Sequence, residues 1–148
     1  MEPRLQIDPM LLEAATQTAC FIKKHHPQAR EWSDLLGWCI WGISYGFVTC
    51  LRNDDGRIVA LLAMRPVKDP ADGNLAYKHD AEGECIFVDF LMIEDHDDSR
   101  VWPTLTEIMR ERFGPRKKIA FTRLAVHDYE HFLRNTSKKN RIGVPNYV

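Results

Sequence analysis

The sequence lacks closely spaced cysteines, because none of its four cysteines has another cysteine within ten residues along the chain. Metal and redox sites use pairs of cysteines a few residues apart, so this spacing argues against both kinds of site. A chain of 148 residues buries enough surface to fold without a disulfide or a metal. We therefore expect four buried thiols in a reducing compartment. The four residues are Cys20, Cys39, Cys50 and Cys85.

The start of the chain lacks an apolar stretch of the length that a secretion signal needs, since Glu2 and Arg4 flank Pro3 there. We therefore expect a cytoplasmic protein. The longest uncharged stretch, residues 35–51, has about the minimum length for a membrane span. It contains three glycines, and near Tyr45 its composition changes from residues that favour helices to residues that favour strands. This pattern predicts a helix that leads into a strand, and we expect no membrane partner.

The chain also lacks an excess of charge of one sign, since its net charge is −1, but its charges are unevenly distributed. Residues 69–98 contain ten acids and one base, whereas residues 110–148 contain ten bases and three acids. The basic C-terminal third raises the hypothesis of a nucleic acid or another anionic partner. The bases are scattered over several expected elements, which favours an ordinary solvated surface.

No repeat, low-complexity run or linker interrupts the chain, so we expect one domain over residues 1–148. Apolar residues at intervals of three and four predict helices, and Asp, Pro and Gly mark where the helices begin and end. The first helix is the best marked, with Asp8 as N-cap and Pro9 at the first helical position. The predicted helices are residues 9–26, a segment from 33 or 34 to 46, residues 99–113 and residues 127–134.

The strands are predicted from runs of β-favouring residues between turn residues. Residues 85–93 are apolar at eight of nine positions, which predicts a central strand covered by helices on each side. Two runs flank the polar turn 53–56 and predict a hairpin. Residues 68–83 are rich in Asp, Pro and Gly without periodicity, and they predict a long surface loop. The predicted strands are residues 4–7, 47–52, 57–67, 85–93, 117–123 and 142–148.

The expected order of elements, from strand through two helices, a hairpin, a central strand and a helix to the last strands, resembles that of the GNAT acyltransferase superfamily. The resemblance covers nearly the whole chain as topology. It implies an α/β (α+β) fold with a mixed, largely antiparallel sheet and helices on both faces. It also implies a donor that is acyl-CoA or acyl carrier protein.

In that superfamily a glycine-containing loop after the central strand holds the coenzyme A pyrophosphate at a helix N-terminus. This sequence departs from the pattern, because residues 94–100 contain no glycine and four carboxylates. Ser99 and Arg100 end this segment. They are the cofactor-binding residues that the resemblance implies.

A shorter stretch is similar to the toxin-activating lysine acyltransferases, GNAT-like proteins that move a fatty acyl group from acyl carrier protein to a toxin lysine. Their central strand carries an Asp within an aromatic and aliphatic run, and an amphipathic helix with a basic end follows. Residues 87–91 (FVDFL) and then residues 104–113 resemble that pattern. The resemblance implies that an upstream histidine partners the Asp, and His25 and His26 lie in the corresponding region of the chain.

Asp89 is the most informative residue of the predicted central strand. A carboxylate that is turned inward loses its hydration, which raises its pKa unless a hydrogen-bond donor or a cation compensates. Arg65 and Arg123 are candidates for that cation. On the period of two of a strand, the residues expected to share its face are Cys85, Phe87, Leu91 and Ile93.

Two roles are open for Asp89. The first role is catalytic, as a general base or as a residue that orients a histidine beside the path of a nucleophile. The other role is a structural carboxylate paired with an arginine or with backbone donors, and this interpretation is the more favoured. In both roles we expect Asp89 to be largely buried and within hydrogen-bonding distance of Arg, His or backbone donors.

Three further groups of residues are candidates for chemistry. His25 and His26 end the first helix, where the helix C-terminus favours a charged imidazole. Tyr129 is a candidate to protonate a leaving thiolate, a role that the GNAT resemblance implies. His127 and His131 have the spacing of zinc ligands on one helical face, but no third ligand is evident and we expect no metal.

These observations predict an acyltransferase that places an acyl group on the amine of a small molecule or a protein. The alternative is a catalytically inactive GNAT-like module that binds a protein or a nucleic acid through the basic C-terminal third. The missing glycine loop favours the module, whereas Asp89 and the upstream histidines favour the enzyme. The usual activity of the fold favours the enzyme by analogy.

Overall fold

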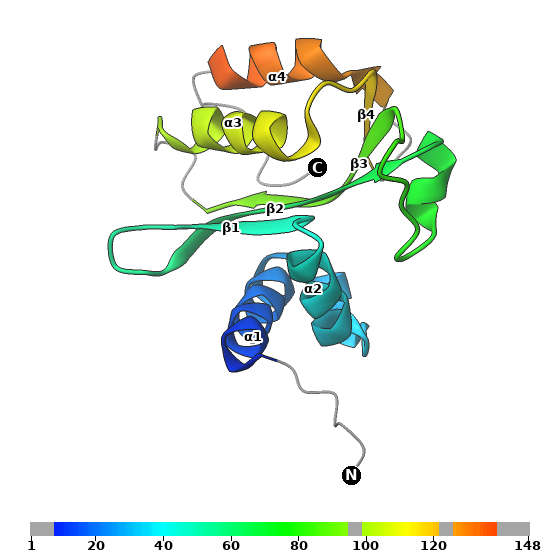
Figure 1. Cartoon of the computed structure of the whole chain (residues 1–148). Coiled ribbons are helices and arrows are strands. Elements are labelled where there is room, and N and C mark those ends of the chain that lie inside the picture. The colour runs from blue at the N-terminus through cyan, green and yellow to red at the C-terminus, as the bar shows by residue number, and fades with distance from the viewer. Residues whose placement is uncertain (1–7, 95–98, 122–125, 139–148) are drawn as a thin grey trace. The chain divides into compact units, whose positions relative to one another are not determined.

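The computed structural model describes residues 8–94, 99–121 and 126–138 (Figure 1). The contacts of the chain divide it into two compact units, Met1–Val48 and Thr49–Val148. Whether the two units act as one domain, as the sequence predicts, stays a prediction. The described elements are α1 (Pro9–His25), the 3₁₀ helix η1 (Pro27–Glu31), α2 (Leu35–Ser44), β1 (Val48–Arg52), β2 (Ile58–Val67), the 3₁₀ helix η2 (Pro70–Asn74), β3 (Cys85–Ile93), α3 (Val101–Phe113), β4 (Lys118–Phe121), β5 (Val126–Asp128) and α4 (Tyr129–Lys138).

The first unit contains α1 and α2, which pack against each other. The Asp8 side chain accepts a hydrogen bond from the N–H of Met10 at 2.9 Å, and Pro9 occupies the first helical position, so the predicted start of α1 is confirmed. α2 follows Asp34, and Gly46 just beyond its end has a φ of 75°, which a glycine adopts without strain. No helix within the described residues is long and apolar enough to cross a membrane.

Two of the four cysteines are buried as predicted, and the prediction is wrong for Cys20. Cys39 and Cys85 are buried and Cys50 is half-buried, but Cys20 is exposed on α1. Cys20 lies four residues after Thr16, on the side of the helix that faces water, whereas the buried side is formed by residues such as Ala15 and Ile22. The apolar neighbours of Cys20 in the sequence did not place it on the buried side.

The second unit is built on one sheet with the strand order β1-β2-β3-β4-β5. β3 therefore lies in the centre, as its apolar composition predicts. β2 and β3 are antiparallel, β3 and β4 are parallel, and β4 and β5 are antiparallel. The sheet is thus mixed and largely antiparallel, and the predicted hairpin between β1 and β2 is confirmed. In its turn the Asn53 side chain accepts hydrogen bonds from the backbone N–H groups of Asp55 and Arg57.

A β-bulge interrupts the pairing of β2 with β3. Ala63 lies opposite Phe90, and the next residue of β2, Met64, lies opposite Val88. Asp89 is therefore the extra residue of β3 and has no partner in the register. The predicted carboxylate is the one position at which the central strand departs from regular pairing with β2.

The bulge overturns part of the predicted alternation on β3. Beyond Asp89 the side chains change sides, because one residue is inserted into a pattern of period two. Leu91 pairs with Leu62. Ile93 pairs with Ala60, so neither Leu91 nor Ile93 shares a face with Cys85 and Phe87. Both are nevertheless buried, since β3 is covered on both faces.

The helix α3 connects β3 to β4 and makes their parallel arrangement possible. α4 packs against α3, and both lie on one side of the sheet (Figure 1). The prediction that helices cover the other face as well stays a prediction. The last predicted helix begins at residue 129 rather than 127, because Val126–Asp128 pairs with β4 as the short strand β5. The strands predicted at residues 4–7 and 142–148 lie outside the described residues.

Candidate functional site

Arg65 is a fully buried arginine on β2, with 2% of its side chain exposed. Its guanidinium has five N–H donors, and the structure gives an acceptor to every one of them. Nε and Nη2 donate to the two carboxylate oxygens of Asp89. Nη1 donates to the backbone carbonyls of Leu75 at 2.7 Å and Lys78 at 2.5 Å. Nη2 also donates to the carbonyl of Gly73 at 2.5 Å. Arg65 therefore joins three backbone carbonyls to one carboxylate.

Asp89 lies where the sequence predicts, largely buried and paired with Arg65. The side chain is 15% exposed, and its oxygens lie 3.0 Å from Nε and 3.2 Å from Nη2 of Arg65. Burial raises the pKa of the Asp89 carboxyl, while the hydrogen bonds and charge of Arg65 oppose the rise. Of the two cations predicted as partners, Arg65 is confirmed and Arg123 lies outside the described residues. Both carboxylate oxygens are engaged, which favours the structural role.

The three carbonyls that accept from Arg65 belong to residues 68–83, the segment between β2 and β3, which we call the strap. The prediction of a loop without periodic structure is wrong for its first half, which forms η2. Asp69 and Asp72 form a reciprocal capping box around the start of η2, and Pro70 fixes its first φ angle. Gly73 lies directly on the ring of Phe87, where a Cβ atom would clash with the ring.

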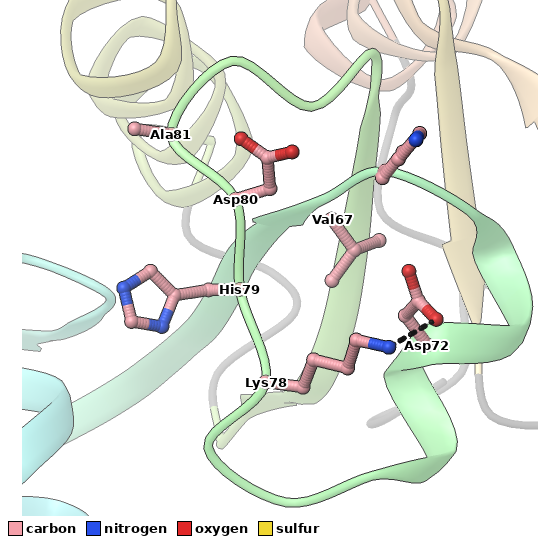
Figure 2. A pocket seen from close by; sticks show the side chains of 7 residues that line it. Val67, Asp72, Lys78, His79, Asp80 and Ala81 are labelled. Carbon is pink, nitrogen blue, oxygen red and sulfur yellow. Dashed lines mark ion pairs between the residues drawn. The ribbon is translucent and has the colours of Figure 1, made fainter.

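A pocket of about 440 Å³ opens between the strap and the end of β2 (Figure 2). Lys78 and Asp72 point toward each other in it, with Nζ and Oδ1 3.0 Å apart, and Val67 contributes apolar surface. The hydrogen bond from Lys78 lowers the pKa of Asp72. The pocket carries both signs of charge, so its lining selects neither an anion nor a cation. The lining residues are Val67, Lys68, Asp72, Lys78, His79, Asp80 and Ala81.

A second feature of this unit lies at the carboxyl end of β3, where the chain turns into α3. Ser99 and Arg100 are exposed there, and Arg100 is the N-cap residue of α3 without a side-chain cap. In the first turn the indole Nε1 of Trp102 is buried and has no hydrogen-bond partner among the described residues. Glu94, one of the four carboxylates after β3, lies 2.8 Å from Arg57 and is neutralised by it.

Tyr129 lies at the start of α4, and its residue is fully buried. Its hydroxyl donates a hydrogen bond of 3.2 Å to the carbonyl of Met109 in α3. Burial raises the pKa of Tyr129 to about 12. The hydroxyl therefore ties α4 to α3, and this position favours a structural role over proton transfer to a leaving thiolate.

His25 and His26 lie at the end of α1, in the other compact unit. His25 is the last residue of the helix, and its ring lies 4.5 Å from that of Phe21. His26 is the C-cap residue, and its N–H bonds to the carbonyl of Ile22. The implied partnership of a histidine with Asp89 stays a prediction, and it would have to compete with Arg65 for the carboxylate.

The prediction that His127 and His131 share a helical face is wrong. His127 belongs to β5, which continues the sheet beside β4, and only His131 lies in α4. The Nε2 atom of His131 lies 2.8 Å from Nδ2 of Asn135. The described residues contain no group of three or more His, Cys, Asp or Glu side chains arranged to hold a metal ion.

Sequence reasoning named Arg65 as a candidate partner of Asp89 but missed the strap carbonyls that bind Arg65. The signal for the pair was present, since Arg65 is the one charge in the ten residues of β2 and Asp89 the one charge in β3. Two opposite charges within adjacent buried strands must pair to be tolerated there. The three strap carbonyls carry no sequence signal, because any residue supplies a carbonyl.

No family model matches the chain, and searches of curated proteins and of solved structures give no match either.

Proposed function

We propose that the protein is an acyltransferase of GNAT-like architecture, which moves an acyl group from acyl-CoA or acyl carrier protein to an amine. The observation that carries the proposal is the parallel pair β3 and β4 with α3 as the crossover between them. In open α/β sheets, ligands bind outside the carboxyl ends of parallel strands, and by analogy we place the donor at this end of β3 and β4. The N-terminus of the crossover helix lies at that edge and favours anionic groups. Both proposed donors bring a phosphate together with the thioester.

The chain offers residues that fit such a donor at this edge. The Arg100 guanidinium supplies a positive charge and the Ser99 hydroxyl a hydrogen-bond donor, both exposed before the first turn of α3. The side chain of the N-cap residue Arg100 does not cap that turn, whose N–H groups we propose as donors to phosphate oxygens. The ion pair of Glu94 with Arg57 reduces the repulsion that the nearby carboxylates exert on an anion.

Within this proposal Asp89 is a positioning residue. Its two oxygens bind Arg65, so it holds the bulge of β3 in place and does not take a proton from the acceptor. A catalytic role for His25 and His26, which lie in the other compact unit, stays a prediction.

The alternative, a catalytically inactive module, is favoured by the same pairing of Asp89 with Arg65. Its nucleic-acid form has less support, because several bases of the C-terminal third have internal partners. Arg110 pairs with Glu130 at 2.7 Å, and Lys117 pairs with Glu84 at 3.0 Å. Arg116 donates to backbone carbonyls. A protein partner is the form of the alternative that keeps its support.

Thermal unfolding in the presence of donors tests the proposal. A ligand that binds the folded protein at 100 times its Kd adds about 2.7 kcal/mol of stability, which is a measurable shift of Tm. We expect a shift with a panel of acyl-CoAs or with an acylated carrier protein, and a smaller shift for Arg100→Ala. Arg112→Ala changes an exposed arginine at the opposite end of the same helix and should keep the full shift.

If no donor shifts the Tm, the proposal that the protein is an acyltransferase is wrong. Equal losses of the shift in Arg100→Ala and Arg112→Ala would contradict the position of the donor site. Where a shift is seen, transfer of a labelled acyl group to a small amine or to a lysine peptide then identifies the class of acceptor.

A further inference from the structure

The strap covers part of the sheet without a fully buried side chain of its own. Among its sixteen residues only Gly73 and Gly83 are buried. Leu75, its one large aliphatic side chain after the first turn, is 55% exposed. Burial of apolar surface by the strap's own side chains therefore contributes little to holding it down.

The strap carries its own internal hydrogen bonds. The N–H of Asp72 bonds to the carbonyl of Asp69 at 2.9 Å, and the N–H of Leu75 bonds to that of Asp72 at 3.1 Å. Further along, the N–H of Lys78 bonds to the carbonyl of Leu75 at 3.3 Å. With the capping box at the start of η2, these bonds keep the first half of the strap together as a unit.

Polar contacts fasten this unit to the sheet. Three of them are the bonds from Arg65 to strap carbonyls, and a fourth is the bond from the N–H of Asp80 to the carbonyl of Pro66 at 2.8 Å. At the far end Arg116 donates to the carbonyls of Ala81 and Gly83, which fixes the strap where it enters β3. Tyr77, between these points, has a φ of 67°, in the left-handed region that residues other than glycine rarely adopt.

An apolar cluster lies beneath the strap. It consists of Val67, Cys85, Phe87 and Ala120, each at most 2% exposed. Gly73 rests on the Phe87 ring, and the guanidinium carbon of Arg65 lies 5.3 Å from the centre of the same ring. The pocket beside Val67 marks the side at which the cover is incomplete (Figure 2).

We propose that the strap is a latched cover, which swings away from the sheet as a unit while the sheet stays folded. The latch is Arg65, held in position by Asp89. Opening breaks the bonds of Arg65 to the strap, exposes the cluster of Val67, Cys85 and Phe87, and leaves the far end attached through Arg116. Such a local opening has a lower free energy than global unfolding because it releases polar contacts and exposes one cluster, not the core of the sheet.

Alkylation of cysteine thiols in the full chain tests this proposal, since Cys85 lies under the strap. The probe is iodoacetamide, with the modified residue identified by mass spectrometry of peptides. We expect Cys85 to react by a route whose rate rises with urea less steeply than global unfolding does, because the opening exposes one cluster and not the whole core. Cys39, buried in the other unit, reports on opening elsewhere in the chain. A Cys85 rate that follows the urea dependence of global unfolding at all concentrations would overturn the proposal.

Two variants test the latch. Asp89→Asn removes the charge that holds Arg65, and we expect it to accelerate the alkylation of Cys85 at least 10-fold more than that of Cys39. Lys78→Gln breaks the ion pair with Asp72 on the surface of the strap but keeps the capping box and the backbone carbonyl that accepts from Arg65, so it should leave the Cys85 rate within about 2-fold. Equal acceleration at Cys85 and Cys39 in Asp89→Asn would overturn the latch. If Asp89→Asn does not fold, the urea dependence of Cys85 alkylation in the unsubstituted protein decides between local opening and global unfolding.

Discussion

Asp89 and Arg65 pair through both oxygens of the carboxylate, and Asp89 is the residue that the register of β2 and β3 leaves without a partner. The two facts have one physical cause. A bulge redirects the side chain at the inserted position, and here the redirected carboxylate meets the one cation in the neighbouring strand. The pair satisfies two charges that neither strand could bury alone.

Replacing Asp89 by Asn should destabilise the fold by about 3 kcal/mol or more, because it leaves the buried Arg65 guanidinium without a counter-charge. The size of the side chain is nearly unchanged, so the loss comes from the charge. Urea unfolding followed by circular dichroism measures it. A general base would behave differently, with a loss of turnover of roughly 100-fold and a modest loss of stability. A stable Asn variant with unchanged activity would exclude both roles.

The matched control is Glu94→Gln, which breaks another ion pair of the same unit. The partner of Glu94 is Arg57, whose side chain is 62% exposed. Water therefore compensates the loss of the pair, and we expect a change below about 1 kcal/mol. Equal losses in the two variants would show that burial does not decide the strength of these pairs.

Arg65→Lys should also destabilise by about 3 kcal/mol or more, although it keeps the positive charge. A lysine offers three donors from one nitrogen and cannot reach a carboxylate and three separate carbonyls at once. Carbonyls that lose their donor while buried each cost about 1–3 kcal/mol. Arg57→Lys changes an exposed arginine and should stay within about 0.5 kcal/mol, so a small effect at both positions would contradict the importance of the guanidinium geometry.

Most helices and strands could be predicted because each is encoded by residues that are close together in the sequence. The bounds of β3 followed from its apolar run, and the start of α1 followed from Asp8 and Pro9. The bulge at Asp89 was missed because a strand with one inserted residue has the same composition as a regular one. Its existence depends on which residue of β2 lies opposite, and that is a long-range property.

The candidate site was predicted only in part for the same reason. Arg65 and Asp89 each stand out as a charge within an apolar strand, so their pairing could be foreseen. The fold of the strap over Phe87 depends on backbone carbonyls and on Gly73, which carry no chemical label in the sequence. The spacing of His127 and His131 likewise predicted one helix, but His127 pairs with β4 and lies in a strand.

Gly73→Ala should destabilise the protein by about 1–3 kcal/mol, because the added methyl group overlaps the ring of Phe87. The effect should shrink when Phe87→Leu is introduced first, since the smaller side chain leaves room for the methyl group. Gly37→Ala is the control within the helix α2, where the new Cβ meets only the end of the flexible Asp34 side chain. A Gly73→Ala effect that is independent of residue 87 would contradict this packing.

The last prediction concerns Tyr129 at high pH. Its pKa is raised to about 12 in the folded protein, against about 10 in the unfolded chain. The folded state therefore keeps the proton longer, so the contribution of Tyr129 to stability is fully present below pH 10 and is lost as the pH rises through 12. Tyr129→Phe lacks the titrating group, and its stability should fall less between pH 9 and about 11.5 than that of the unsubstituted protein. The comparison cancels the lysines that titrate in both proteins, and parallel pH profiles from urea unfolding would contradict the buried hydroxyl that ties α4 to Met109.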